Sequence, residues 1–224
     1  MQNLLLAARR AAAVAGLFAV VSCVGSRELI DPTLHIQAPG GASELGVSTD
    51  YGIVFLGRVA RSGEIEVTAW FGDGPSQERA VVEPVGGGLY TAETEIRLPS
   101  VALSFQDPAP GTVLRVYGRR RGESWQTEAR IVRDERVDGL LLADSGGLRD
   151  ASDEQLGAGV YVCLDDDCRD KRLIGLVSGR LVLRDESGER SYLTMVGPSE
   201  LWRLVTHRRD LDRRRPWVYR PDIL

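Results

Sequence analysis

Short runs of apolar residues, separated by turns rich in glycine and proline, fill the chain from residue 33 to residue 132. In residues 64–72, Ile65, Val67 and Ala69 alternate with polar neighbours, which is typical of a strand with one buried face. Residues 51–59 are almost continuously apolar, which predicts a central strand. The strands expected from these patterns span residues 33–38, 51–59, 64–72, 79–85, 89–98, 112–120 and 124–132. Seven short strands at this spacing predict an antiparallel β-sandwich.

A second, smaller β unit is expected after a polar linker at residues 134–157. Its strands are predicted at residues 158–164, 172–177, 180–185 and 190–196. Leu201, Leu204 and Val205 then follow Ser199 at helical spacing, which favours a short C-terminal helix and leaves a strand as the alternative. The predicted class is therefore all-β, with one large unit at residues 33–133 and a meander with a C-terminal tail at residues 158–224.

The stretch Gly88–Ala92 resembles the tyrosine-corner region of immunoglobulin-like and fibronectin-III-like domains. The resemblance implies that Tyr90 bonds back to the chain and that Ala92 occupies the core position two residues later. Gly86 stands where those families commonly carry an aspartate, and the unit has no disulfide pair. We expect an immunoglobulin-like sandwich on this basis, with another type of β-sandwich as the alternative.

The N-terminus has the pattern of an export signal. Arg9 and Arg10 precede residues 11–21, which carry no charge. Eleven residues rise about 16 Å as a helix, roughly half the hydrocarbon thickness of a bilayer. The segment therefore predicts a secretory signal at residues 1–22, and an anchor helix over residues 4–24 is the alternative.

Val20-Val21-Ser22-Cys23 resembles the lipobox of bacterial lipoproteins. The resemblance implies cleavage after Ser22, acylation of Cys23, and a short tether at residues 23–32 between the lipid and the folded part. The residue after Cys23 is Val24. An aspartate at this position would imply retention at the inner membrane, so the resemblance implies the outer membrane instead. The alternatives are an ordinary signal peptide, or a cytoplasmic or inner-membrane protein in which the pattern is accidental.

If Cys23 carries lipid, Cys163 and Cys168 remain as a pair. Four residues separate them, so they could close a small loop at a hairpin tip. Redox sites of the thioredoxin type have two intervening residues, and a zinc site would need two more ligands. We therefore predict a structural disulfide.

The overall charge argues against a nucleic-acid partner. The chain has 28 basic and 32 acidic residues, a formal net charge of −4, and Lys171 is its single lysine. Loss of Arg9 and Arg10 with the signal leaves 26 basic residues, so the net charge falls to −6. Nucleic-acid-binding domains usually carry a basic surface.

The C-terminal tail concentrates arginine and aromatic residues. It could meet an anionic lipid, an anionic glycan or an acidic envelope protein. The alternative is that Trp217–Tyr219 pack as a last strand while the arginines pair with acidic side chains. The candidate contact residues are Arg208, Arg209, Arg213, Arg214, Arg215, Trp217 and Arg220.

No metal or cofactor site is expected. Asp165, Asp166 and Asp167, with Asp170, could offer oxygen ligands to calcium. The segment lacks the glycine and the distal glutamate of an EF-hand. We therefore interpret it as a solvated hairpin tip.

Catalytic signals are weak. His35 falls in an expected edge strand and His207 in a charged stretch. Ser145, in Asp144–Gly147, resembles the serine-protease phrase Gly-Asp-Ser-Gly-Gly, but Ala143 replaces its first glycine. The chain also lacks the matching histidine context and the two-barrel length, so we take this match as accidental.

The leading functional hypothesis from the sequence is a lipid-anchored, non-enzymatic binding or assembly module of the bacterial cell envelope. The alternative is an envelope hydrolase or glycan-processing enzyme with unidentified catalytic residues.

Overall fold

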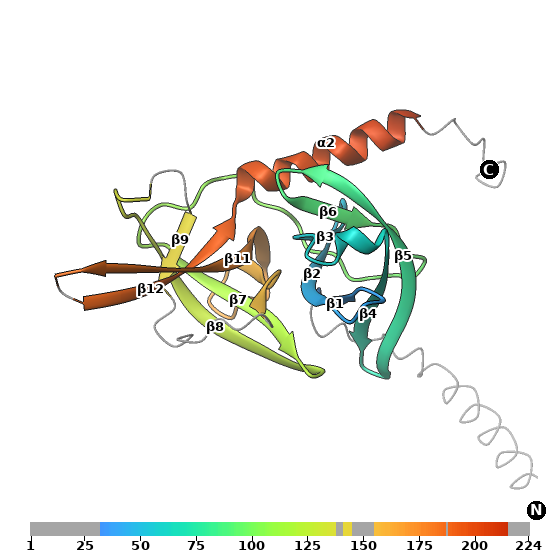
Figure 1. Cartoon of the computed structure of the whole chain (residues 1–224), viewed down its shortest axis with the longest axis horizontal. Helices are drawn as coiled ribbons and strands as arrows, with labels where there is room; N and C mark the ends of the chain where they lie inside the picture. Colours follow the sequence, from blue (N-terminus) through green and yellow to red (C-terminus); the bar gives the residue numbers. More distant parts are fainter. Residues whose placement is uncertain (1–31, 138–140, 145–154, 187, 215–224) are drawn as a thin grey trace, which may run out of the picture.

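The computed structural model describes residues 32–137, 141–144, 155–186 and 188–214, and every structural statement below concerns these residues. They form two closed antiparallel β-barrels of six strands each, followed by one α-helix (Figure 1). The first barrel contains β1 (Thr33–Gln37), β2 (Ser43–Thr49), β3 (Gly52–Phe55), β4 (Glu64–Phe71), β5 (Gly74–Gly86) and β6 (Leu89–Ala92), with the 3-10 turn η1 (Ala60–Ser62). The second contains β7 (Val113–Arg120), β8 (Glu123–Val132), β9 (Leu141–Asp144), β10 (Gly159–Cys163), β11 (Lys171–Asp185) and β12 (Gly188–Val196), and it leads into helix α2 (Pro198–Arg214).

The predicted immunoglobulin-like sandwich is wrong. The first barrel has the order β1-β2-β3-β6-β5-β4 and closes where β1 pairs with β4, at His35 opposite Thr68. The strands β7 and β8, predicted as the end of the sandwich, pair instead with β10 and β9 in the second barrel. Alternation shows that one face of a strand is buried, which is equally true of a sandwich and a barrel, so it could not reveal this closure.

The inner faces of the strands fill each barrel. In β4, Ile65, Val67, Ala69 and Phe71 are all at most 5% exposed, which confirms the alternation expected for this strand. They pack with Leu34, Ile36 and Phe55 inside the first barrel. A barrel of this size has just enough interior for side chains, so its centre is a core and not a channel.

A third apolar cluster, which we call the seam, lies between the barrels and under α2. Strand β3 contributes to two clusters at once. Ile53 and Phe55 point into the first barrel, whereas Val54 belongs to the seam. Burial on both faces is why this stretch reads as continuously apolar. The buried members of the seam are Val47, Val54, Leu89, Val101, Leu103, Tyr161, Leu173, Leu176, Leu201, Leu204 and Val205.

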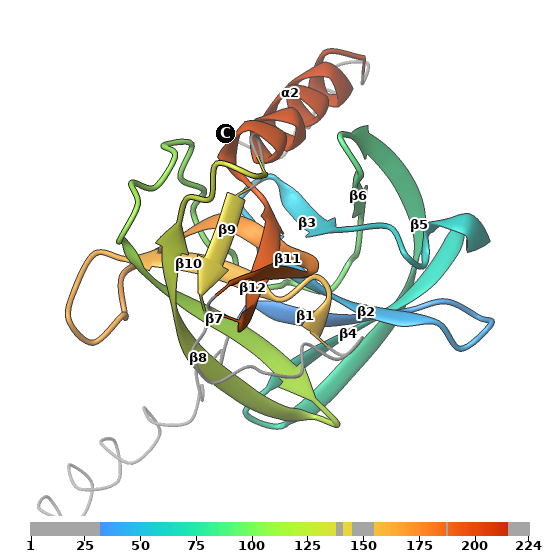
Figure 2. The same ribbon diagram turned by 60° about the vertical axis from the view of Figure 1, so that its left-hand side comes forward.

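The segment after β12, for which the sequence favoured a helix and left a strand as the alternative, forms helix α2. It leaves β12 of the second barrel and lies across the end of the first, next to β5 and β6 (Figures 1 and 2). Leu201, Leu204 and Val205 are its buried face, at 0–1% exposure. Within the described ranges no helix has the length and apolarity to cross a membrane.

Tyr90 does not mark a tyrosine corner of a sandwich. It lies on β6 and stacks against Phe55, with ring centroids 6.2 Å apart. The ring also covers Gly57, where a Cβ atom would come within 2.0 Å of it. A glycine is needed at position 57 for this close approach, and its φ of 79° suits that residue as well.

Candidate functional site

The two barrels touch at a turn just before β10. The amide of Leu45 on β2 donates to the carbonyl of Leu156 over 2.8 Å, and the amide of Gly157 donates to the carbonyl of Val177 over 2.8 Å. Gly157 has a φ of 81°, and a Cβ atom there would lie 1.9 Å from the Leu45 carbonyl oxygen. The turn is therefore held by both barrels at once.

Beside this junction, Glu44 is a buried carboxylate. It is 3% exposed, and its two oxygens accept the amides of Leu56 and Val59, each over 3.1 Å. Burial raises the pKa of Glu44 above its ordinary value, while the amide hydrogen bonds oppose that rise. Glu44 thus fixes the loop between β3 and η1 against β2.

His35 lies on β1, opposite Leu45 on one side and Thr68 on the other. Burial lowers its pKa, and the charge of Glu66 partly opposes this. Among the described residues no serine or cysteine side chain hydrogen-bonds to His35. Its place in the sheet makes it part of the wall of the barrel.

His207 is the histidine that has a carboxylate partner. Its Nε2 atom on α2 lies 3.2 Å from Oε2 of Glu83 on β5. Glu83 and His207 are 124 positions apart in the sequence and meet because α2 crosses the first barrel. A histidine oriented by a carboxylate can serve as a general base.

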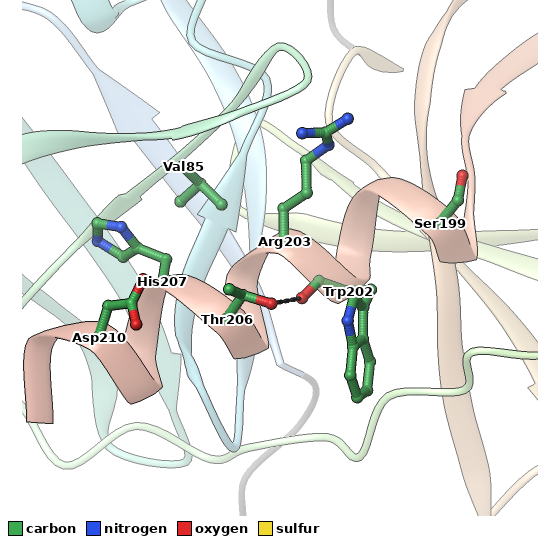
Figure 3. A pocket seen from close by; sticks show the side chains of 7 residues that line it. All are labelled: Val85, Ser199, Trp202, Arg203, Thr206, His207 and Asp210. Carbon is green, nitrogen blue, oxygen red and sulfur yellow. Dashed lines mark hydrogen bonds between the residues drawn. The ribbon is translucent and has the colours of Figure 1, made fainter. Parts of the chain in front are cut away.

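His207 borders a surface hollow of about 460 Å³ between α2 and β5 (Figure 3). Val85, Trp202, Arg203 and Asp210 contribute to its lining. Mixed apolar, aromatic and charged walls of this kind can hold a small ligand or a segment of polypeptide.

The hydroxyl groups in the hollow do not act on His207. Thr206 donates to the carbonyl of Trp202 over 3.3 Å, within the helix. Ser199 bonds to Glu200 over 2.7 Å and lies eight residues before His207, about 12 Å along the helix axis. The arrangement can activate a water molecule, but it does not contain a Ser-His pair.

The structure brings together only some of the residues singled out in the sequence. Cys163 and Cys168 form a disulfide with a Cα–Cα distance of 4.7 Å, joining the end of β10 to the approach to β11. Asp165 accepts the amide of Asp170 over 3.2 Å, and the described residues contain no group of three or more metal-ligating side chains. Cys23 lies outside the described residues.

The arginines at the end of the chain are tied into α2. Arg208 pairs with Glu93 over 2.9 Å and with Asp212 over 3.5 Å. Arg213 pairs with Asp210 over 3.8 Å. Arg215, Trp217, Arg220 and the side chain of Arg214 are outside the described residues, so the suggested last strand is too.

One of the two objections to the serine-protease phrase at Asp144–Gly147 is wrong. Asp144 is the last residue of β9 and Ser145–Gly147 are outside the described residues. The objection from two-barrel length fails, because the chain has two barrels. The objection from histidine context stands for the described part, where neither histidine forms a hydrogen bond with a serine or cysteine side chain.

Comparison with known proteins identifies the fold. No protein-family model matches the chain, and no curated protein matches it either. Among solved structures, the MamO protease domain from Magnetospirillum magneticum is 17% identical, with a TM-score of 0.56 over 80% of this chain and 97% of that one. Deg5 is 16% identical, with a TM-score of 0.54 over 77% and 86%. The serine endoprotease from Yersinia pestis is 16% identical, with a TM-score of 0.55 over 84% and 65%.

The chain therefore has the double-barrel fold of trypsin-like serine proteases. This finding contradicts the prediction of a non-enzymatic module, which was based on the weak catalytic signals of the sequence and on a sandwich fold that the chain does not have. A double set of six strands with an Asp-Ser-Gly-Gly phrase after the ninth strand was the sequence signal that could have indicated this fold.

Proposed function

We propose that the chain is a hydrolase of the bacterial cell envelope that acts on polypeptide. The observation that carries the proposal is the closed double barrel, which the chain shares with the proteases named above. Fold alone does not define an activity. The proposal therefore also needs a group that can activate a nucleophile.

His207 and Glu83 are the groups that the described residues offer. In the proposed step the neutral imidazole of His207 takes a proton from water while the water oxygen bonds to the peptide carbonyl carbon. Glu83 stabilises the imidazolium that forms. The imidazolium then returns the proton to the departing amine as the C–N bond breaks, so that atoms and charges balance.

The test measures cleavage of quenched-fluorescent casein by the full chain. The His207→Gln variant should lose activity by about 100-fold or more, the usual contribution of a general base. The matched control is His35→Gln, which removes the histidine in the barrel wall and should keep the activity. Circular dichroism of both variants checks that they fold.

Three results separate the parts of the proposal. If the wild type binds casein without cleaving it, the hydrolase is wrong. If Ser145→Ala abolishes cleavage and His207→Gln does not, hydrolysis stands and the proposed base is wrong. Equal loss in both histidine variants would also contradict a specific role for His207.

The proposed location follows from the lipobox resemblance at residues 20–23. An acylated Cys23 would hold the protein at the membrane, and Val24 favours the outer membrane. Labelling with radioactive palmitate should mark the wild type and not the Cys23→Ala variant. Label that persists in the variant would contradict the anchor, and label in the inner-membrane fraction of a density gradient would contradict the outer-membrane assignment.

A further inference from the structure

Two exposed aromatic side chains form a pair at the start of α2. Phe105, on the segment between β6 and β7, meets Trp202 edge to face, with ring centroids 4.9 Å apart and an interplanar angle of 87°. Phe105 is 40% exposed and Trp202 45%. We call this pair the aromatic corner. Exposed aromatic pairs supply large contact areas when a partner covers them.

One cation of α2, Arg209, adjoins the aromatic corner, and a second, Arg203, lines the hollow beside it. The guanidinium of Arg209 lies 5.7 Å from the ring centroid of Trp202. Neither Arg209 nor Arg203 forms an ion pair with a described carboxylate, whereas Arg208 and Arg213 on the same helix both do. Among the described residues, the positive charges of Arg203 and Arg209 are therefore available to a ligand, whereas those of Arg208 and Arg213 are neutralised.

The aromatic corner borders the hollow of Figure 3: Trp202 and Arg203 both line the hollow, and their side chains extend to opposite sides of α2. Val85 adds an apolar surface there. We propose that the aromatic corner, Arg203 and Arg209 together bind an acidic segment of polypeptide that carries an aromatic side chain. The guanidinium groups would take the carboxylates in paired hydrogen bonds, and the aromatic side chain would pack against Trp202.

The charge pattern favours a polypeptide over a membrane surface. Anionic membranes are recognised by clusters of four to eight basic residues. Asp210 and Asp212 neutralise two of the arginines of α2. In the part of α2 whose side chains the structure describes, two available guanidinium groups beside a hollow match a few carboxylates on a peptide. The inference deepens the proposed function by naming the class of polypeptide, and it is tested by binding alone.

The experiment measures fluorescence anisotropy of fluorescein-labelled Gly-Glu-Phe-Asp-Gly with the full chain carrying His207→Gln, so that turnover does not interfere. Trp202→Ala and Arg209→Gln, each added to this background, should raise the Kd about tenfold or more. The matched controls, Val182→Ala and Arg169→Gln, remove an exposed apolar side chain and an exposed arginine elsewhere and should leave the Kd unchanged. The amide peptide Gly-Gln-Phe-Asn-Gly should bind at least tenfold more weakly.

Equal binding of the acid and amide peptides would overturn the proposal, and so would an unchanged Kd in both test variants. Binding to phosphatidylglycerol vesicles that requires Trp202 and Arg209, without binding of the peptide, would identify a membrane surface instead and also overturn it. Peptide binding in a protein that cleaves no casein would uphold this inference while the hydrolase failed.

Discussion

Leu45 and Leu156, far apart in sequence and on different barrels, share a backbone hydrogen bond of 2.8 Å. The Leu45 carbonyl sits where a side chain at position 157 would have to go. Gly157→Ala should therefore destabilise the protein by about 3–5 kcal/mol, from the left-handed backbone and the clash together. Urea unfolding followed by circular dichroism measures this change.

Gly63→Ala is the matched control for that prediction. Gly63 has a similar φ of 71° but open space around it. The variant should cost about 1–2 kcal/mol, the backbone contribution alone. If the two variants cost the same, the contact between Gly157 and Leu45 does not tie the barrels together.

Glu44 should give the stability of the protein a recognisable pH dependence. Folding raises the pKa of Glu44 above the ordinary 4.5, so protonation of Glu44 stabilises the folded state relative to the unfolded state. That contribution is complete below pH 4.5 and is lost as the pH rises through the folded pKa. The Glu44→Gln variant lacks this contribution. The difference in the free energy of unfolding between wild type and variant should therefore be larger at pH 4 than at pH 8.

Chemical denaturation across this pH range tests the Glu44 prediction. At every pH the variant should also be weaker by about 1–3 kcal/mol, because the amide cannot satisfy both the Leu56 and Val59 amides. A gap that widens with rising pH would mean that folding lowers the pKa of Glu44.

His35 should titrate below its ordinary value of 6.5, because burial disfavours its charged form. Its neutral form stabilises the fold fully above pH 6.5, and this stability is lost as the pH falls through the lowered pKa. Glu66→Gln removes the charge that opposes the shift and should lower the pKa of His35 further. NMR titration of the His35 ring measures it, and Glu64→Gln, on the same face of β4, is the control that should change it less.

The Cys163–Cys168 disulfide should contribute about 2 kcal/mol, since it closes a short loop. The double variant Cys163→Ser/Cys168→Ser should lose this amount in urea unfolding, and dithiothreitol should do the same to the wild type. Hydrogen exchange should increase at the β10–β11 connection. A double variant as stable as the wild type would leave the bond without a structural role.

The sequence predicted local structure far better than assembly. The alternation of Ile65, Val67 and Ala69 identified a strand with one buried face, and Leu201, Leu204 and Val205 identified the buried face of α2. Both patterns report burial along a single element. The pairing of β1 with β4, and of β7 with β10, joins strands that are far apart in the sequence, and no local pattern encodes it.

The candidate site was harder still to predict. The charged stretch around His207 indicated no partner for this histidine, and its partner Glu83 lies 124 positions away. Their contact exists only because α2 crosses the first barrel. The aromatic corner also joins two distant segments, so neither Phe105 nor Trp202 had a sequence signal of its own.

The path of the chain between the barrels has a consequence for how the protein can be divided. The connection after β6 carries Val101 against Thr49 and Leu103 against Leu173, and α2 later returns from the second barrel to the first. Each barrel, with the segments attached to it, thus covers apolar surface of the other barrel. We expect that residues 32–112 or residues 113–214, produced separately, would be insoluble, and that the two halves would regain solubility when produced in the same cell.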